Sequence, residues 1–218
     1  MPFKYYGGVH PDEMKQPHLA VSYIPQPSQV AIPLQMHIGA PCQPLVKVGD
    51  VVTMGQKIGD NPAPLCAPIH ATVSGKVVAI EPRRHCVVGD LVPSIVIEND
   101  GLDTPCTDLA PLTEEQLKDP EAIIQRIREA GVVGMGGAMF PTHFKIQGGR
   151  GKVDTLIING AECEPYLNGD HRTMLEHPVE LLKGIELVRI AQGVDTAYYG
   201  IEENKQDAID LLNSLNPE

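Results

Sequence analysis

A glycine-rich loop lies between a predicted helix and a second helix that starts near Pro141. Its glycines stand at positions 131, 134, 136 and 137. Glycine adopts positive φ without strain and lets the backbone approach a ligand, while a helix start adds N–H donors and a positive dipole end. We therefore predict that this glycine loop, residues 131–141, binds a phosphate group.

Two common nucleotide motifs do not fit this loop. A Walker loop needs Lys and then Ser or Thr after its second glycine, but Gly136 is followed by Gly137 and Ala138. A Rossmann fingerprint that starts at Gly134 needs glycine or alanine at position 139, where this chain has Met139. A purely structural interpretation also stays open, because glycine is the usual residue after a helix C-terminus.

The loop belongs to a half of the chain in which predicted helices and strands alternate. We expect helices at residues 120–130, 178–192 and 205–215, and strands at 153–158 and 196–201. This alternation is typical of an α/β fold with a parallel sheet. Ligands of such sheets bind beyond the carboxyl ends of the strands.

An amide and several carboxylates follow those two strands. They are Asn159, Glu162 and Glu164 after the first strand, and Glu202 and Glu203, next to Gly200, at the end of the second. Carboxylates repel a phosphate but accept hydrogen bonds from ribose hydroxyls, a carboxamide or a flavin N–H group. The pattern favours a ligand with a polar organic body and a phosphate tail. Alternatively, the acids are helix-start residues that the helix dipole favours.

Composition and cysteine spacing exclude several classes of protein. The net charge of −11 argues against nucleic-acid binding, and no apolar run approaches the roughly 20 residues of a membrane helix. The N-terminus lacks a hydrophobic signal core, so we expect reduced thiols. The cysteines at 42, 66, 86, 106 and 163 form no C-x-x-C pair and have no histidine at a zinc-like offset, so we predict no metal site.

The first half of the chain is rich in short predicted strands. They cover residues 30–32, 45–48, 51–53, 71–73, 76–80 and 94–98. Residues 48–59 and 67–77 resemble the two halves of a biotinyl or lipoyl carrier, which is a barrel-sandwich hybrid. The hairpin between the halves, residues 60–66, contains no lysine for the carrier to modify. We predict an N-terminal arm (1–29), the barrel-sandwich hybrid (30–98), a linker (99–112) and a partial FMN/NADH-binding α/β domain (113–218).

The chain as a whole resembles the RnfC family, whose members belong to the Rnf electron-transport complex, the ferredoxin:NAD⁺ oxidoreductase of bacterial membranes. The likeness runs from Gly7-Gly-Val-His-Pro11 to the segments 134–145, 159–165 and 170–172. These last segments also resemble the FMN and NADH site of the flavoprotein subunit of respiratory complex I.

The resemblance implies noncovalent FMN, which exchanges a hydride with NADH and passes single electrons to iron–sulfur clusters. It implies that Gly134, Gly136, Gly137 and Ala138 approach the cofactor with backbone atoms and that Lys145 neutralises phosphate. It further implies that Asn159 hydrogen-bonds the flavin, that Phe140 stacks on nicotinamide or adenine, and that Glu162 and Glu164 contact the nicotinamide or its ribose. We expect no catalytic acid or base, because the cofactor itself accepts the hydride.

Two positions depart from the complex I pattern. Ala161 stands where those relatives have an aspartate, and Met135 stands where they have a basic residue. The hydrogen bonds of those groups are therefore absent or replaced here. Family members also continue beyond the position of Glu218 into a region that carries two [4Fe–4S] clusters. The resemblance thus implies an N-terminal portion that is inactive alone.

The resemblance also implies a place for the protein in the cell. We expect a peripheral protein at the cytoplasmic face of the membrane that contacts the membrane only through other Rnf subunits, with ferredoxin and NADH as partners. Within the same class, a flavin-dependent cobalamin reductase of microcompartments and a subunit of the sodium-pumping NADH:quinone reductase are alternatives. A non-catalytic scaffold module is the alternative from another class.

Overall fold

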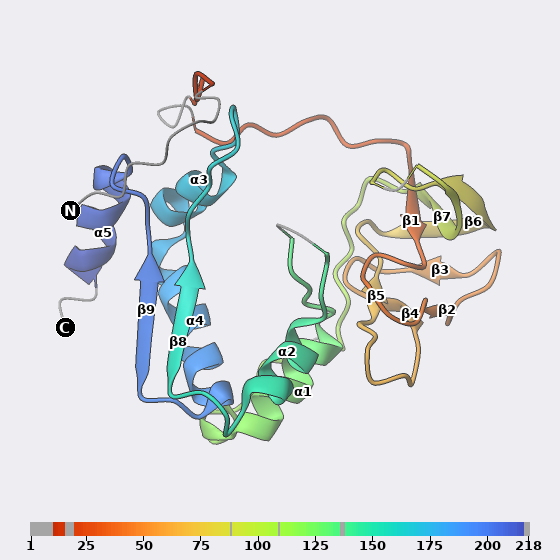
Figure 1. The fold of residues 1–218 in the computed structure, drawn as a ribbon. Helices are drawn as coiled ribbons and strands as arrows, with labels where there is room; N and C mark the ends of the chain where they lie inside the picture. The colour runs from red at the N-terminus through yellow and green to blue at the C-terminus, as the bar shows by residue number, and fades with distance from the viewer. Residues whose placement is uncertain (1–10, 16–19, 88, 109, 136–137, 216–218) are drawn as a thin grey trace. The chain divides into compact units, whose positions relative to one another are not determined.

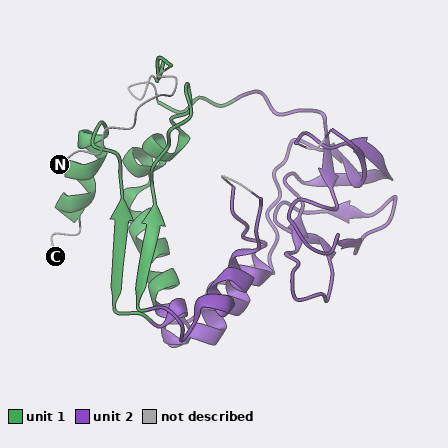
Figure 2. Ribbon diagram, viewed as in Figure 1, with its two compact units in different colours: residues 1–23, 154–189, 194–218 green, residues 24–153, 190–193 purple. Residues whose placement is uncertain are grey.

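The computed structural model describes residues 11–15, 20–87, 89–108, 110–135 and 138–215. Contacts between Cα atoms divide the chain into two compact units, which Figure 2 colours separately. Unit 1 comprises residues 1–23, 154–189 and 194–218, and unit 2 comprises residues 24–153 and 190–193. The predicted domain boundaries at 98 and 112 stay predictions, whereas these contacts group the first two α-helices with the β-rich half.

The β-rich half of unit 2 consists of two antiparallel sheets (Figure 1). The four-stranded sheet has the order β1-β7-β6-β3 and the three-stranded sheet the order β2-β4-β5. Their strands are β1 (Gln29–Pro33), β2 (Gln43–Pro44), β3 (Val51–Val52), β4 (Lys57–Asp60), β5 (Ile69–His70), β6 (Gly75–Arg84) and β7 (Leu91–Asn99). One core lies between them and includes the fully buried side chains of Ile58, Val77, Ile95 and Ile97.

Two of the strand predictions for this half are wrong. Residues 45–48 form a turn rather than a strand, because Gly49 has a φ of +99° and Asp50 donates its N–H to Lys47 O at 3.1 Å. Leu45 and Val48 are exposed, so no core holds them in an extended row. Residues 71–73, where a strand was expected, are not in a strand. The strand β5 ends at His70, immediately before them.

Two helices, α1 (Pro120–Glu129) and α2 (Thr142–Gly149), flank the glycine loop. The side chain of Asp119 accepts the Glu121 N–H at 3.1 Å and caps α1, and Pro120 occupies the first turn. Thr113 and Gln116 form a capping box, with both reciprocal bonds. It precedes a short 3₁₀ turn, η1 (Gln116–Lys118).

Half-buried ion pairs fasten α1 to strand β4. Arg128 lies 2.9 Å from both Asp60 and Glu129, and Lys57 contacts Glu129 and lies 3.4 Å from Asp60. The charge of Arg128 and its hydrogen bond hold the pKa of Asp60 below its usual range despite partial burial, which acts in the other direction. The end of α1, and with it the start of the glycine loop, is thus attached to the β-rich half of unit 2.

Unit 1 is built on two parallel strands, β8 (Thr155–Asn159) and β9 (Thr196–Gly200) (Figure 1). The helices that accompany them are α3 (Gly169–Glu176), α4 (Pro178–Gln192) and α5 (Gln206–Leu215). The expected parallel sheet and the helices at 178–192 and 205–215 are confirmed. Met174 of α3 packs with Ala208 and Leu212 of α5 in the buried core of this unit.

Among the described residues, no helix is both long and apolar enough to span a bilayer.

Candidate functional site

The loops that follow β8 and β9 meet at one end of the sheet in unit 1. The parallel register pairs Asn159 with Gly200, so both strands end at the same level. Gly160 then donates its N–H to Gly200 O at 2.8 Å. Gly160 has to be glycine, because a Cβ atom there would lie 2.5 Å from the ring of Tyr199. We call the two loops, residues 159–164 and 200–205, the strand-end rim.

A buried lysine lies between two acids of the strand-end rim. Lys205 is 2% exposed, and its Nζ lies 2.8 Å from Glu202 Oε2 and 3.8 Å from Glu162 Oε2. The Glu202 carboxylate also accepts the Glu162 N–H at 3.3 Å. The hydrogen bond from Lys205 holds the pKa of Glu202 below its usual range. A buried ammonium thus neutralises part of the negative charge that the sequence places here.

Glu162 serves the fold as well as the charge balance of the rim. Its side chain is 7% exposed, and its Oε1 accepts the Asp170 N–H at 3.0 Å, in the first turn of α3. A carboxylate is favourable at this position because it faces the positive end of the helix dipole. Burial and then the negative charge of Glu162 raise the pKa of Asp170.

Two further contacts hold neighbouring segments at the strand-end rim. His171 of α3 is buried, and its Nε2 lies 2.7 Å from Asp207 Oδ1 of α5. Lys15, from the N-terminal segment, donates its Nζ to the Glu162 carbonyl oxygen. The sequence did not single out Lys15 or Asp207, because their partners lie far away along the chain. It did not single out Lys205 either. The Glu-x-x-Lys spacing of Glu202 and Lys205 was the available signal.

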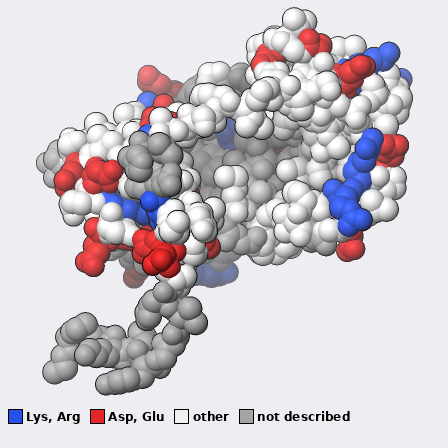
Figure 3. Space-filling model, turned by 90° about the horizontal axis from the view of Figure 1, so that it is seen from above, with Lys and Arg blue, Asp and Glu red and all other residues white. Residues whose placement is uncertain are grey.

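The remaining rim residues face solvent. Asn159, Glu164, Gly200 and Glu203 are exposed, and the Asn159 Oδ1 accepts the Ala161 N–H at 3.0 Å. Gly200 has room for a side chain, because the nearest atom to a Cβ there would be Ile158 O at 3.8 Å. Seen onto the strand ends, the surface of this unit carries acidic and basic side chains beside each other (Figure 3). The exposed residues of the rim therefore offer hydrogen-bonding groups to a ligand. The charge of its more buried acids is partly balanced by Lys205.

The glycine loop of unit 2 is closed at its base by backbone bonds. Val133 and Pro141 form an isolated antiparallel bridge, and Gly134 donates its N–H to Phe140 O at 3.0 Å. Thr142 donates to Val132 O at 3.0 Å where α2 begins. The prediction that α2 starts near Pro141 is therefore confirmed.

Two glycines of this loop have different reasons for being glycine. Gly131 ends α1 with a φ of +68°, and a Cβ there would lie 2.3 Å from Pro68 O. It is therefore a helix-capping residue in close contact with the β-rich half. A Cβ on Gly134 would meet nothing closer than the backbone of Phe140 at 3.8 Å. Gly136 and Gly137 lie outside the described residues.

An ammonium group and an aromatic ring lie next to each other beyond the loop. The Lys145 Nζ is 5.9 Å from the centre of the Phe140 ring, which is 6.1 Å from the ring of Phe144. Lys145 and Ala138 are exposed and Phe140 is half-buried, so these groups are open to a ligand. Met135 is 93% exposed. The structure thus brings Phe140 and Lys145 together, as the assigned roles require.

The predicted site residues fall in both units. Gly134, Ala138, Phe140 and Lys145 belong to unit 2, and the residues of the strand-end rim belong to unit 1. The expectation that the glycine loop and the rim share one ligand therefore stays a prediction.

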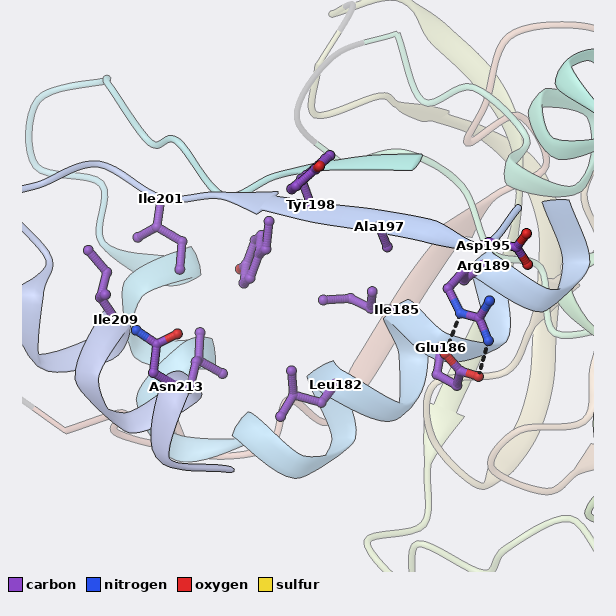
Figure 4. A pocket seen from close by; sticks show the side chains of 12 residues that line it. Leu182, Ile185, Glu186, Arg189, Asp195, Ala197, Tyr198, Ile201, Ile209 and Asn213 are labelled. Carbon is purple, nitrogen blue, oxygen red and sulfur yellow. Dashed lines mark hydrogen bonds and ion pairs between the residues drawn. The ribbon is translucent and has the colours of Figure 1, made fainter. Parts of the chain in front are cut away.

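A large groove in unit 1 lies on the face of β9 rather than at the rim. It has a volume of about 970 Å³ and is lined mainly by apolar side chains, among them Leu182, Ile185 and Ile209 (Figure 4). Its arginine is already occupied, because Arg189 pairs with Glu186 at 2.7 Å and donates to Val194 O at 2.9 Å. We assign no ligand to this groove, because its arginine is already paired within the groove.

Comparison with known protein families assigns both halves of the chain. Residues 3–102 match the RnfC barrel sandwich hybrid domain, and residues 127–216 match the Nuo51 FMN-binding domain. The RnfC subunit of the Na⁺-translocating ferredoxin:NAD⁺ oxidoreductase complex of Acetobacterium woodii is 43% identical over 211 residues, 95% of this chain. The chain belongs to the RnfC family. The expected fold class, a barrel-sandwich hybrid followed by an FMN-binding domain, is confirmed by the same matches.

Two other members of the RnfC family are similarly close. The corresponding subunit of the proton-translocating ferredoxin:NAD⁺ oxidoreductase complex of Clostridium ljungdahlii is 41% identical over 95% of this chain. That of the ion-translocating oxidoreductase complex of Rhodobacter capsulatus is 42% identical over 98%. The chain spans 47%, 46% and 42% of the lengths of these three relatives. It thus matches about half of each relative.

Proposed function

We propose that this chain provides the FMN- and NADH-binding part of an RnfC subunit in an ion-translocating ferredoxin:NAD⁺ oxidoreductase complex. The match of residues 127–216 to an FMN-binding domain and the names of the relatives support this proposal. Those names also favour an Rnf complex over a cobalamin reductase. FMN, when bound, exchanges a hydride with the nicotinamide and single electrons with iron–sulfur clusters, which the protein itself cannot do.

The observation that carries the proposal is the open space at Gly134. A position usually requires glycine when its φ is positive or when neighbouring atoms leave no room for a Cβ atom. Gly134 meets neither condition, because the nearest neighbour of a Cβ there would lie at 3.8 Å and its φ is not positive. An approaching phosphate or ribityl chain would explain the glycine, and the Lys145 ammonium, which lies next to the Phe140 ring, would supply the countercharge. The residues present therefore fit a phosphorylated cofactor.

The residues of unit 2 would hold the phosphate side of the cofactor. The backbone of the glycine loop at Gly134 and Ala138 would approach it, and Lys145 would neutralise its charge. The half-buried ring of Phe140 would stack on a planar group of the cofactor or of NADH.

The strand-end rim would hold the polar ring system. Asn159 already uses its Oδ1 on Ala161, so its NH₂ group is the end that would donate to a flavin carbonyl. Glu164 and Glu203, which are exposed, would accept hydrogen bonds from ribose hydroxyls. Glu162 and Glu202 would act mainly through Lys205, by keeping the rim in position.

The partners and location follow from the same assignment. The relatives belong to complexes of several subunits, so other Rnf subunits are the first partners. We propose ferredoxin as the electron donor and NAD⁺ as the acceptor, with electrons passing through two [4Fe–4S] clusters in the remaining part of the subunit. The protein would lie at the cytoplasmic face of the membrane, attached through partner subunits.

Titration of FMN with the purified chain, followed by quenching of flavin fluorescence, tests the proposed binding. We expect the Lys145→Glu variant to bind FMN at least about tenfold more weakly than the unchanged chain, because one phosphate-facing charge is reversed. Lys76→Glu is the matched control, since Lys76 is an exposed lysine of strand β6 in the same unit. Equal weakening by both variants would mean that only net charge matters, and equal binding by all three proteins would remove Lys145 from the site.

A further inference from the structure

Three buried side chains in the β-rich half of unit 2 lie around one point. His37 and Cys42 lie between β1 and β2, and Cys66 lies in the hairpin between β4 and β5. Their exposed fractions are 4%, 3% and 0%. The carbonyl oxygen of Ala67 faces the same point. We call these four groups the His37 cluster; Cys42 and Cys66 come from different segments of the chain, which is why cysteine spacing did not reveal it.

The four ligand-type atoms form a nearly regular tetrahedron. Cys42 Sγ lies 3.6 Å from Cys66 Sγ, 3.9 Å from His37 Nε2 and 3.3 Å from Ala67 O. Cys66 Sγ lies 3.7 Å from His37 Nε2 and 3.8 Å from Ala67 O, and His37 Nε2 lies 3.0 Å from Ala67 O.

These six edges match those of a tetrahedral zinc site. With ordinary zinc bond lengths the edges would be about 3.8 Å between sulfurs, about 3.6 Å from sulfur to nitrogen, about 3.5 Å from sulfur to oxygen and about 3.4 Å from nitrogen to oxygen. The observed edges agree within about 0.4 Å. A cation at the centre would therefore reach all four atoms without rearrangement of the backbone.

The hydrogen bonds of His37 prepare its Nε2 as a ligand. Its Nδ1 lies 3.0 Å from Ile38 O and its Nε2 lies 3.0 Å from Ala67 O; metal binding through Nε2 requires the tautomer with the proton on Nδ1, which then donates to Ile38 O. The Ala67 N–H donates to Nε2 at 3.2 Å, which also requires a lone pair there. The Nε2 lone pair and the Ala67 carbonyl oxygen, two acceptors, then face each other at 3.0 Å. A cation between them would turn this unfavourable contact into two bonds, in place of the hydrogen bond from the Ala67 N–H.

A role as a reactive thiol does not fit Cys42. Burial, followed by the hydrogen bond with Cys66, raises the pKa of the Cys42 thiol to about 12. Such a thiol stays protonated at neutral pH and is a poor nucleophile. A metal ion removes this barrier because it binds the thiolate directly, and each coordinated thiol releases its proton to solvent.

We propose that the His37 cluster is a structural site for a tetrahedral, thiolate-binding divalent cation, for which zinc is the best fit. Two thiolates and an imidazole disfavour hard cations such as magnesium and calcium. All four ligand groups are buried, as in closed structural sites rather than catalytic ones.

The position of the cluster gives the bound metal a structural purpose. It would tie the segment around His37 to the hairpin that contains Cys66, where Ala40 already donates its N–H to Leu65 O at 3.0 Å. In the same unit Ile38 donates to Met139 O of the glycine loop at 3.4 Å. The metal would thus brace the edge of the barrel against which the glycine loop is placed.

The test is metal content and cobalt spectroscopy of the purified whole chain. We expect one zinc ion per chain after exchange with zinc, and after exchange with cobalt the visible bands and thiolate charge-transfer band of a tetrahedral site. Cys42→Ser and Cys66→Ser should lose both signals. Cys86→Ser, which changes an exposed cysteine of the same unit, should keep them.

Other outcomes decide against the proposal. A metal-free chain with two reduced thiols that takes up neither zinc nor cobalt would overturn it, as would a disulfide between Cys42 and Cys66. If a serine variant does not fold, His37→Gln keeps both thiols and should still lose the tetrahedral cobalt spectrum. An unchanged spectrum in His37→Gln would also contradict the assigned ligand set.

Discussion

Single residues of the candidate site divide into those that the fold requires and those that it does not. Gly131 has positive φ and no room for a side chain, whereas Gly134 has room for one. The sequence shows only that both are glycines, and therefore left the capping and phosphate interpretations open together. The structure assigns capping to Gly131, whereas ligand binding by Gly134 stays a prediction.

This difference predicts opposite effects of two alanine substitutions. Gly131→Ala should lower the free energy of unfolding by about 2 kcal/mol, because a left-handed alanine is strained and its Cβ would contact Pro68 O. Gly134→Ala should change that free energy by less than about 1 kcal/mol. We expect it nevertheless to weaken FMN binding about tenfold, by filling the space of the ligand.

Urea denaturation and flavin fluorescence measure the two effects on the same proteins. Unchanged FMN affinity in Gly134→Ala would show that the open space at this residue does not receive the cofactor. Gly131→Ala thereby serves as a control for changes that act on the fold.

Glu162 shows how far residue roles can be derived from sequence. The resemblance to the complex I site implied that it contacts the nicotinamide or its ribose. In the structure its carboxylate accepts the Asp170 N–H and lies near Lys205, which comes from the other loop of the rim. That lysine is separated from Glu162 by two helices and a strand, so no local pattern could connect the two residues.

At the scale of elements, a helix was predictable where the sequence marks its start and its end with typical residues, such as proline and glycine. Helix α4 runs from Pro178 to Gln192 as expected, because a proline starts it and Gly193 with a φ of +73° follows it. Helix α3 (Gly169–Glu176) was missed, since its sequence is mostly polar and only His171 and Met174 are buried. Its start depends on the carboxylate of Glu162, which is a tertiary contact.

Helix α2 is expected to make unit 2 sensitive to acid. His143 is 3% exposed and lies 3.2 Å from Pro64 O through its Nε2, so this nitrogen carries the proton of the neutral ring. Burial lowers the pKa of His143, and burial likewise lowers that of His70 on β5. Protonation would place a second N–H at His143 Nδ1, a buried atom without a hydrogen-bond partner.

The sign of the effect follows from proton uptake. A histidine whose pKa is lowered in the folded state binds its proton more readily after unfolding, so stability falls as the pH drops below about 6.5. We expect the melting temperature to fall by several degrees between about pH 7.5 and about pH 5.5. His143→Gln should reduce this fall while His70 preserves part of it. A melting temperature that is equal at both pH values in the unchanged chain would contradict this assignment.

At the scale of the whole molecule, two units carry the two halves of the proposed site. The sequence predicted both family domains and the meeting of the two strand-end loops, because motifs and strand order are local features. It could not predict the His37 cluster or the burial of Lys205, because both depend on tertiary contacts between distant segments. The matching family models are the RnfC barrel sandwich hybrid domain for residues 3–102 and the Nuo51 FMN-binding domain for residues 127–216.

We propose that the glycine loop of unit 2 and the strand-end rim of unit 1 contact the same bound FMN. Hydrogen–deuterium exchange of the chain with and without FMN tests it most directly. We predict slower exchange in peptides that cover residues 132–145 and also in those that cover 159–164 and 200–205, with no change in strands β6 and β7. Protection of only one of these segments, or of neither, by FMN that is shown to be bound would contradict the claim.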